Sequence, residues 1–278
     1  MPEIKEQAGP RPAEVSYLQP PALPGIMMVT AAFYGTTVPP STVDRRWTFA
    51  RTDVGDGDAT VGRTEIHLVA GVLLALEPGD CITPVRRHAD HTAFRTLLVE
   101  PEFIARFVET AFPDGGVKLC RGILGDGAVE AFDAFWSGVQ SGDGPLEQEG
   151  LLAAFLEAAS DNTKHVAGAA ITPPIARAKQ LLEDRYADDV RLEQLEQEIG
   201  LSRFYLVRRF RAEVGMPPHA YQLAVRLDHA RVMVASGVPL SEVASRCGFT
   251  DQSHLTRHFR RATGVSPGAY ARSAGVRR

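Results

Sequence analysis

The stretch that decides the fold is residues 239–261, which read PLSEVASRCGFTDQSHLTRHFRR. Its first part carries an apolar stripe at helical spacing, made of Val243, Ala244 and Cys247. Gly248 follows, and glycine commonly ends a helix because it tolerates positive φ. Leu255 and Phe259 then form the inward stripe of a second helix. The pattern predicts two short helices joined by a tight turn, with Ser241 capping the first helix and Thr250 or Asp251 capping the second.

The same pattern occurs earlier in the chain, at a constant offset of 49 residues. Eight identities carry this repeat: Leu206, Arg208, Phe210, Arg211, Gly215, Pro218, Ala220 and Tyr221 recur as Leu255, Arg257, Phe259, Arg260, Gly264, Pro267, Ala269 and Tyr270. In the first copy Gly200 is the expected helix stop and Ser202 the expected cap of the second helix. Such self-similarity indicates a duplicated supersecondary unit.

Two short helices joined by a glycine-containing turn are typical of the helix-turn-helix, whose second helix enters the major groove of DNA. An ordinary helical hairpin with a solvated outer face is the alternative, but Phe204 and Val207 would then expose apolar groups to water. In a groove they could meet thymine methyls, while Arg and Gln can read guanine and adenine. The candidate DNA-binding residues are Ser202, Arg203, Phe204, Val207, Arg208, Asp251, Gln252, Ser253, Thr256 and Arg257.

Charge is distributed unevenly between the two halves of the chain. Residues 171–278 hold 17 Lys and Arg against 11 Asp and Glu, whereas residues 1–170 hold 13 against 23. A basic half beside an acidic half is consistent with a polyanionic partner for the C-terminal half, although a solvated basic face would give the same balance.

The segments 239–249, 251–261 and 264–270 closely resemble the signature of the AraC family of bacterial transcription regulators, and the resemblance covers about residues 173–273. It implies two helix-turn-helix units joined by a long helix, here about residues 218–236. That helix would place the recognition helices in adjacent major grooves, about 34 Å apart. Where the family usually has Ala, this chain has Glu196, which we expect to disturb a close helix contact in the first unit.

The first half of the chain has the pattern of strands, and the C-terminal part has the pattern of helices. Together they predict an α+β protein. Short strand-like runs separated by turn residues extend from residue 26 to about residue 100, and helical periodicity begins near Pro101. By resemblance to the arabinose-regulator type, this half would be a cupin-like β-barrel followed by dimerisation helices. The expected divisions are a flexible arm at 1–25, the cupin-like effector-binding and dimerisation domain at 26–160, a linker at 161–172 and the DNA-binding domain at 173–278.

Three further predictions concern sites in this half. Metal-binding cupins carry a His-x-His pair and a third His, and His67, His88 and His91 lack that spacing, so we predict no metal and no cofactor. A small organic effector could be lined by Phe33, Trp47, Phe49 and His67, although a role in the core is the simpler reading for them. Contiguous apolar residues near 146–159 favour a homodimer contact. The candidate dimerisation residues are Leu151, Leu152, Phe155 and Leu156.

The sequence argues against an enzyme and predicts no catalytic residues, because it contains no phosphate-binding glycine loop, Gly-x-Ser-x-Gly or His-Glu-x-x-His motif. Three scattered cysteines and the absence of a signal or membrane-spanning pattern favour the cytoplasm and no membrane partner. The expected protein is a regulator that binds double-stranded DNA, senses an effector and contacts RNA polymerase if it is an activator. The alternatives are a regulator whose first half only dimerises and, more remotely, a cupin enzyme fused to a DNA-binding domain.

Overall fold

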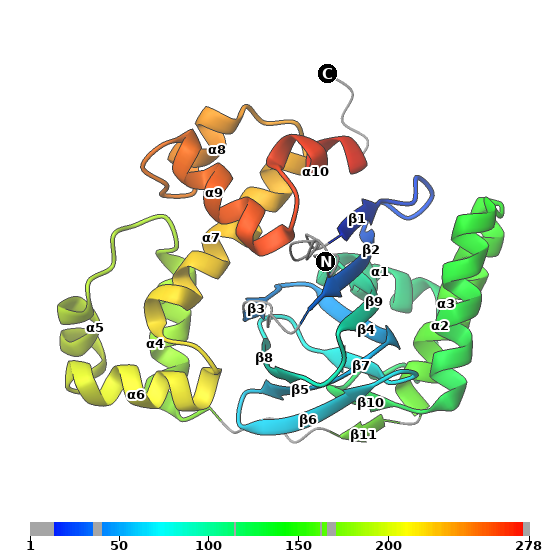
Figure 1. Cartoon of the computed structure of the whole chain (residues 1–278), viewed down its shortest axis with the longest axis horizontal. Coiled ribbons are helices and arrows are strands. Elements are labelled where there is room, and N and C mark those ends of the chain that lie inside the picture. Colours follow the sequence, from blue (N-terminus) through cyan, green and yellow to red (C-terminus); the bar gives the residue numbers. More distant parts are fainter. Residues whose placement is uncertain (1–13, 36–40, 114, 162, 166–170, 275–278) are drawn as a thin grey trace, which may run out of the picture.

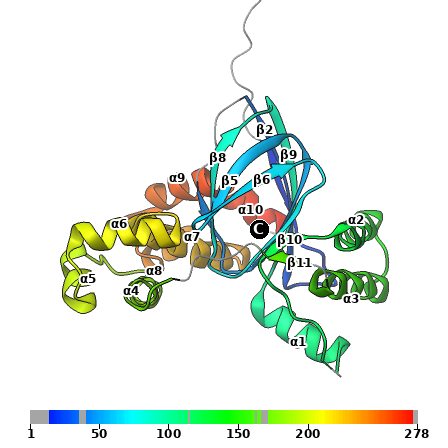
Figure 2. The ribbon, with the colours of Figure 1, turned by 90° about the horizontal axis from the view of Figure 1, so that it is seen from below.

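Within the described residues, strands predominate before Pro101 and only helices occur from Pro173 onward, which confirms the α+β class (Figure 1). The computed structural model describes residues 14–35, 41–113, 115–161, 163–165 and 171–274. The strands lie between helices α2 and α3 on one side and the C-terminal helices on the other (Figures 1 and 2). No helix in these described ranges is long and apolar enough to cross a membrane.

The strands of the N-terminal domain form two antiparallel sheets, and within the described residues they do not close into the expected barrel. The larger sheet has the order β1-β2-β9-β4-β7-β10-β11, and the smaller has the order β3-β8-β5-β6. Val61 and Ile66 of the smaller sheet pack against Leu74 and Leu76 of the larger one, so the sheets face each other across an apolar layer. The strands are β1 (Glu14–Leu18), β2 (Ile26–Tyr34), β3 (Thr42–Val43), β4 (Trp47–Val54), β5 (Asp56–Val61), β6 (Thr64–Val69), β7 (Leu73–Leu76), β8 (Cys81–Arg87), β9 (His91–Val99), β10 (Gly122–Leu124) and β11 (Thr163–His165).

Three helices cover the sheet region: α1 (Pro101–Ala111), α2 (Asp126–Ser141) and α3 (Pro145–Asp161). Aromatic side chains join the larger sheet to the α2–α3 pair. The ring of Phe155 lies edge-on to Phe49 at 5.0 Å and to Phe132 at 5.7 Å between centroids. All three side chains are fully buried, so this aromatic cluster is the centre of the N-terminal core.

Two expected segment assignments are wrong in part. Glu14–Leu18 was expected within a flexible arm, but it forms β1 and pairs with β2 from Glu14 opposite Ala32 to Leu18 opposite Met28. Residues 1–13 of that arm lie outside the described part. Thr163–His165 was expected within the linker, but it pairs with β10 as β11. In both cases a neighbouring strand edge supplies backbone partners that local sequence does not reveal.

The C-terminal domain is entirely helical, as expected. The long helix α7 connects two helix pairs, and α5–α6 and α8–α9 lie at its opposite ends (Figure 1). The helices are α4 (Pro173–Asp184), α5 (Leu192–Ile199), α6 (Arg203–Val214), α7 (Pro218–Ala235), α8 (Leu240–Arg246), α9 (Gln252–Thr263) and α10 (Pro267–Ser273).

The two domains dock through the outer face of the larger sheet. Side chains alternate along a strand, so Ile26 and Met28 of β2 enter the N-terminal core while Met27 and Val29 point the other way. Met27, Val29 and Leu98 pack in one apolar cluster with residues of α7, α9 and α10. Tyr17 of β1 adds a hydrogen bond of 2.8 Å from its hydroxyl to the carbonyl oxygen of Thr263. Burial raises the pKa of this hydroxyl to about 12.

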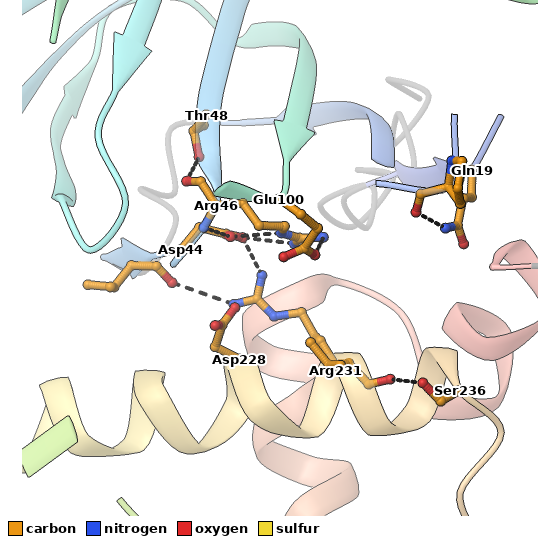
Figure 3. Close-up of polar contacts among 11 residues, drawn as sticks. Gln19, Asp44, Arg46, Thr48, Glu100, Asp228, Arg231 and Ser236 are labelled. Carbon is orange, nitrogen blue, oxygen red and sulfur yellow. Dashed lines mark hydrogen bonds and ion pairs between the residues drawn. The ribbon is translucent and has the colours of Figure 1, made fainter. Parts of the chain in front are cut away.

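A buried ion-pair network borders this apolar contact. Arg231 of α7 reaches Asp44, which follows β3, at 2.7 Å, and Arg46 contacts the same carboxylate at 2.9 Å (Figure 3). Burial by itself would raise the pKa of Asp44, but Arg46 and Arg231 lower it far below its ordinary value. Because both partners of the Arg231–Asp44 pair are mostly buried, the pair fixes the domains against each other.

Candidate nucleic-acid interface

The second helix pair, α8–α9, has the geometry of a helix-turn-helix. Helix α8 ends at Arg246, and Gly248 then adopts a φ of +71°. A Cβ at Gly248 would lie 2.1 Å from the carbonyl oxygen of Ala187, so only glycine fits this turn. The Asp251 carboxylate accepts a hydrogen bond of 2.7 Å from the His254 amide and caps α9. The cap of α8 was expected at Ser241, but α8 begins earlier, with Pro239 at the cap position.

The first helix pair, α5–α6, repeats this arrangement with weaker capping. Helix α5 ends at Gly200, whose φ is +77°, as the sequence predicts. Ser202 stands at the cap position of α6, but its side chain makes no capping hydrogen bond. Since a capping side chain typically stabilises a helix by about 1 kcal/mol, the start of α6 is held less firmly than the start of α9.

The sequence repeat is also a repeat in space. Phe210 packs edge-on against Tyr221 at 5.7 Å, and Phe259 packs in the same way against Tyr270 at 5.4 Å. All four side chains are essentially buried. The apolar and glycine identities at the 49-residue offset therefore preserve two equivalent cores, whereas the pairs Arg208/Arg257 and Arg211/Arg260 preserve cations on the outer faces.

The predicted DNA-binding residues reach the surface in both units. Phe204 is 88% exposed, although phenylalanine is usually buried. Val207 and Thr256 are half-buried at the flanks of their helices. The remaining predicted residues are exposed: Ser202, Arg203, Arg208, Asp251, Gln252, Ser253 and Arg257.

Three arginines that the sequence interpretation left out extend these faces. Arg260 and Arg261 line a shallow hollow on α9 together with the predicted Gln252, Ser253, Thr256 and Arg257. Arg211 is exposed on α6 and corresponds to Arg260 at the 49-residue offset. Continuing the helical spacing by one more turn beyond Arg257 and Arg208 would have found all three.

The two outer faces differ in charge. On α9, burial lowers the pKa of His258, and the neighbouring His254, Arg257 and Arg261 lower it further. On α6, Arg203 contacts Glu193 at 2.5 Å and Glu196 at 3.3 Å. Glu196 is half-buried and reaches outward to Arg203, so the expected disturbance of a helix contact is replaced by an ion pair. The positive charge of the α9 face therefore comes from Arg257, Arg260 and Arg261, which form no ion pair within the described residues, and it exceeds that of the α6 face, where Arg203 is paired.

The four predicted effector-lining residues do not meet in one place. Trp47 and Phe49 stack at 6.2 Å, but Phe49 is fully buried in the N-terminal core. Phe33 packs on Phe94, and His67 is bound to Asp58 on the outer surface of the smaller sheet. Their role in binding an effector stays a prediction.

The predicted dimerisation residues pack inside the N-terminal core of this same chain. Leu152, Phe155 and Leu156 have no exposed surface, and Leu151 packs partly buried against the same core. The expectation that this segment leaves apolar surface for a second copy is therefore wrong for these side chains. The apolar residues surround α3 because it packs against both α2 and the larger sheet. Dimerisation itself stays a prediction, but these four side chains do not supply its contact surface.

The fold and the two exposed helices define a double helix-turn-helix DNA-binding domain, and the comparisons of its sequence with known proteins agree. Residues 195–273 match the family described as a helix-turn-helix domain. The transcriptional activator RhaS of Escherichia coli is 34% identical over 87 residues, which are 31% of this chain and 31% of RhaS. A transcriptional regulator with an AraC-type DNA-binding domain from Chromobacterium violaceum is 23% identical over 37% of this chain and 92% of its own, with a TM-score of 0.35.

Residues 195–273 thus form a helix-turn-helix domain of the AraC type, which is the resemblance that its motifs implied. The chain spans only 28–32% of the length of the first curated relatives it matches. For the whole chain, the crystal structure of ToxT from Vibrio cholerae O395 covers 91% of this protein and 99% of ToxT, with 11% identity and a TM-score of 0.51. That likeness concerns the fold, and it places a sheet domain before a helical domain in both proteins.

Proposed function

We propose that this protein is a transcription regulator that binds a specific sequence of double-stranded DNA through α6 and α9. The observation that carries the proposal is the duplicated helix-turn-helix, whose two second helices expose arginine, glutamine and unpaired apolar side chains. Exposed apolar side chains have few structural uses on a solvated surface, and base edges and thymine methyls offer partners for both the polar and the apolar groups. Activation or repression would follow from where the binding site lies relative to the promoter.

The test is selection of genomic fragments by the purified full chain, followed by gel-shift titration of the recovered sites. We expect one enriched sequence with two contact regions about one helical turn apart. Affinity should fall steeply as salt rises, because each phosphate contact releases counterions. Equal affinity for selected and random fragments would overturn sequence-specific regulation.

We also propose that a small polar effector binds between the domains. A cavity of about 220 Å³ is bounded by the turn from Glu77 to Cys81 and by Arg121 on one side, and by Lys179, Glu213 and Val214 on the other. Burial raises the pKa of Asp80 there, although Arg121 opposes this effect. The cavity is smaller than the roughly 300–1,000 Å³ of typical drug-sized sites, so a compact solute with charged or hydroxyl groups suits it.

The location matters because a ligand shifts a conformational equilibrium only through different contacts in the two states. A solute that contacts both domains would change its contacts whenever they move apart. The experiment is a thermal-shift screen of the full chain and its Lys179→Met variant with amino acids, hydroxy acids and sugars. A stabilising solute should lose its effect in the variant, and its affinity should change reciprocally with operator DNA. A solute that stabilises both proteins equally would refute this location.

A further inference from the structure

Two histidines and two aspartates gather on the outer surface of the smaller sheet. The register places His67 of β6 opposite Asp58 of β5. The His88 amide donates a hydrogen bond of 2.9 Å to the carbonyl oxygen of Asp56, which aligns the end of β8 with the start of β5. Because directly opposed residues point to the same face of a sheet, all four side chains share one surface.

The distances within this cluster are short. One carboxylate oxygen of Asp58 lies 2.9 Å from His67 Nδ1, and the other lies 2.9 Å from His88 Nε2. His67 Nε2 lies 3.4 Å from a carboxylate oxygen of Asp56. Ligand atoms of Asp56, His67 and His88 all lie within 4.8 Å of one another.

The hydrogen bonds to Asp58 prepare both imidazoles for coordination. A carboxylate accepts protons, so Asp58 favours the tautomers with hydrogen on His67 Nδ1 and His88 Nε2. Each ring then keeps a lone pair on its other nitrogen. A carboxylate that holds the far nitrogen of a ligand histidine is the usual outer partner at zinc sites.

We propose that Asp56, His67 and His88 bind a divalent transition-metal cation such as Zn²⁺, with Asp58 orienting the two histidines. Tetrahedral zinc at its usual bond lengths holds neighbouring ligand atoms about 3.3 Å apart. The separation of 3.4 Å between His67 Nε2 and Asp56 already matches this, and His88 has to close in from a position within 4.8 Å of both. His67 is 56% exposed, so the ion can enter from solvent and water can complete its coordination.

The site differs from the one that the cupin spacing would imply. Ile66 and Leu68, on either side of His67, pack between the two sheets, so His67 faces away from the interior. The His-x-His rule therefore does not apply to this surface. The register places Arg86 of β8 opposite Asp58, so Arg86 is the positively charged residue beside the proposed metal site. Its exposed side chain can extend into solvent, away from a bound cation. The proposal is independent of DNA binding.

The test uses the full chain without a polyhistidine tag, stripped of metal by a chelator and titrated with Zn²⁺ against a chromogenic competitor. We expect one tight site per chain. His67→Ala and His88→Ala should each weaken binding by at least tenfold, and Asp58→Asn should weaken it by about 10–100-fold through the lost orientation of the ligands. His91→Ala is the matched control, because His91 stacks on Tyr34 at 4.9 Å and belongs to another strand.

A second measurement separates a built site from scattered surface binding. Co²⁺ in a four-coordinate site with two imidazoles should give a stronger visible spectrum than hydrated Co²⁺, and the His67→Ala/His88→Ala double variant should lose it. Unchanged circular dichroism of the double variant would show that it remains folded. The inference is overturned if wild-type protein binds no Zn²⁺ at 100-fold excess over the chain, or if the double variant binds it equally well.

Discussion

In the first helix-turn-helix unit, Arg203 at the start of α6 is held by two carboxylates, whereas the second unit has uncharged Gln252 at the equivalent position. Within the described part of the chain, Arg257, Arg260 and Arg261 of the second unit form no ion pair with an acidic side chain. The Phe–Tyr cores beneath these faces are the same in both units. The duplicated scaffold has thus kept its interior and two outward arginines in each unit, while the first turns of α6 and α9 have diverged, and the second unit carries the more available charge.

The two units also differ in how they meet the N-terminal domain. The first unit touches it at the close approach of Gly215 to Cys81, where a Cβ would lie 3.2 Å from the sulfur. The second unit meets the sheet through the apolar cluster of Met27, Val29 and Leu98, with the Asp44–Arg231 pair beside it. A signal from the N-terminal domain would therefore reach the second unit through a larger buried contact.

Among substitutions that test how the two units contact the N-terminal domain, Asp44→Asn is expected to have the largest effect. The substitution leaves Arg46 and Arg231 buried without their shared carboxylate, and breaking a buried pair in this way costs about 3–5 kcal/mol. Denaturant unfolding would measure the loss. Hydrogen exchange should accelerate in α7 and α10 and remain unchanged in α5 and α6. Equal acceleration in both units would mean that the domains are not anchored mainly at the second one.

Acid offers an independent check on the same contact. The folded pKa of Asp44 lies below its ordinary value of 3.8, so its ionised form adds stability at neutral pH. That stability is fully present above the unfolded pKa and is lost as pH falls through the folded pKa. The difference in unfolding free energy between wild type and Asp44→Asn should therefore shrink progressively below about pH 4. A constant difference from pH 7 to pH 3 would contradict the lowered pKa of Asp44 in the folded protein.

The next effect concerns reading of bases by the second unit. Arg257→Ala should weaken binding to the selected site by about 1–3 kcal/mol and relax preference at one base position. Arg203→Ala is the comparison in the first unit, and we expect a smaller loss because Arg203 must leave Glu193 and Glu196 to reach DNA. Gel shifts against a site library would measure both. If Arg257→Ala weakens every sequence equally, Arg257 contacts a phosphate and not a base.

A smaller effect is expected from Phe204, the most exposed aromatic side chain of the first unit. Phe204→Ala should change the free energy of unfolding by less than about 0.5 kcal/mol, since the ring is on the surface. Binding to the selected site should nevertheless weaken severalfold, because the ring would lose apolar contact in the groove. Tyr205→Ala is the control beside it. Loss of stability with unchanged DNA binding would assign Phe204 a structural role.

The two helix-turn-helix units could be predicted from the sequence because the residues that repeat are mainly those that pack in the two cores. Gly200, Gly215 and the Phe–Tyr pairs occupy the same places in both copies, so periodicity alone located the helices and their outer faces. Edge pairing is not local, and it hid β1 and β11. The spacing of His67 and His88 gave no signal for their cluster, because register across β5, β6 and β8 brings them together. The apolar run at 151–156 was misread because local sequence cannot show that α3 is covered on two sides.

The smallest effect is expected from a substitution at one position where the two units differ. The first unit has Glu196 there, and the second has buried Ala244. Glu196→Ala removes one of the two carboxylates that hold Arg203, and it also removes a negative charge beside the proposed DNA-binding face of α6. Affinity for DNA should rise about two- to fivefold at low salt, by a similar factor for every sequence, because phosphate contacts position the protein without reading bases. The gain should diminish at high salt, where screening weakens interactions between exposed charges.

Glu198→Ala is the matched control, since Glu198 lies on the same helix and pairs with Arg185 at 2.8 Å, away from α6. If both variants gain equally, the effect is one of net charge. If Glu196→Ala binds less tightly than wild type, the ion pair positions Arg203 for DNA, and the first unit uses its carboxylates to orient that arginine.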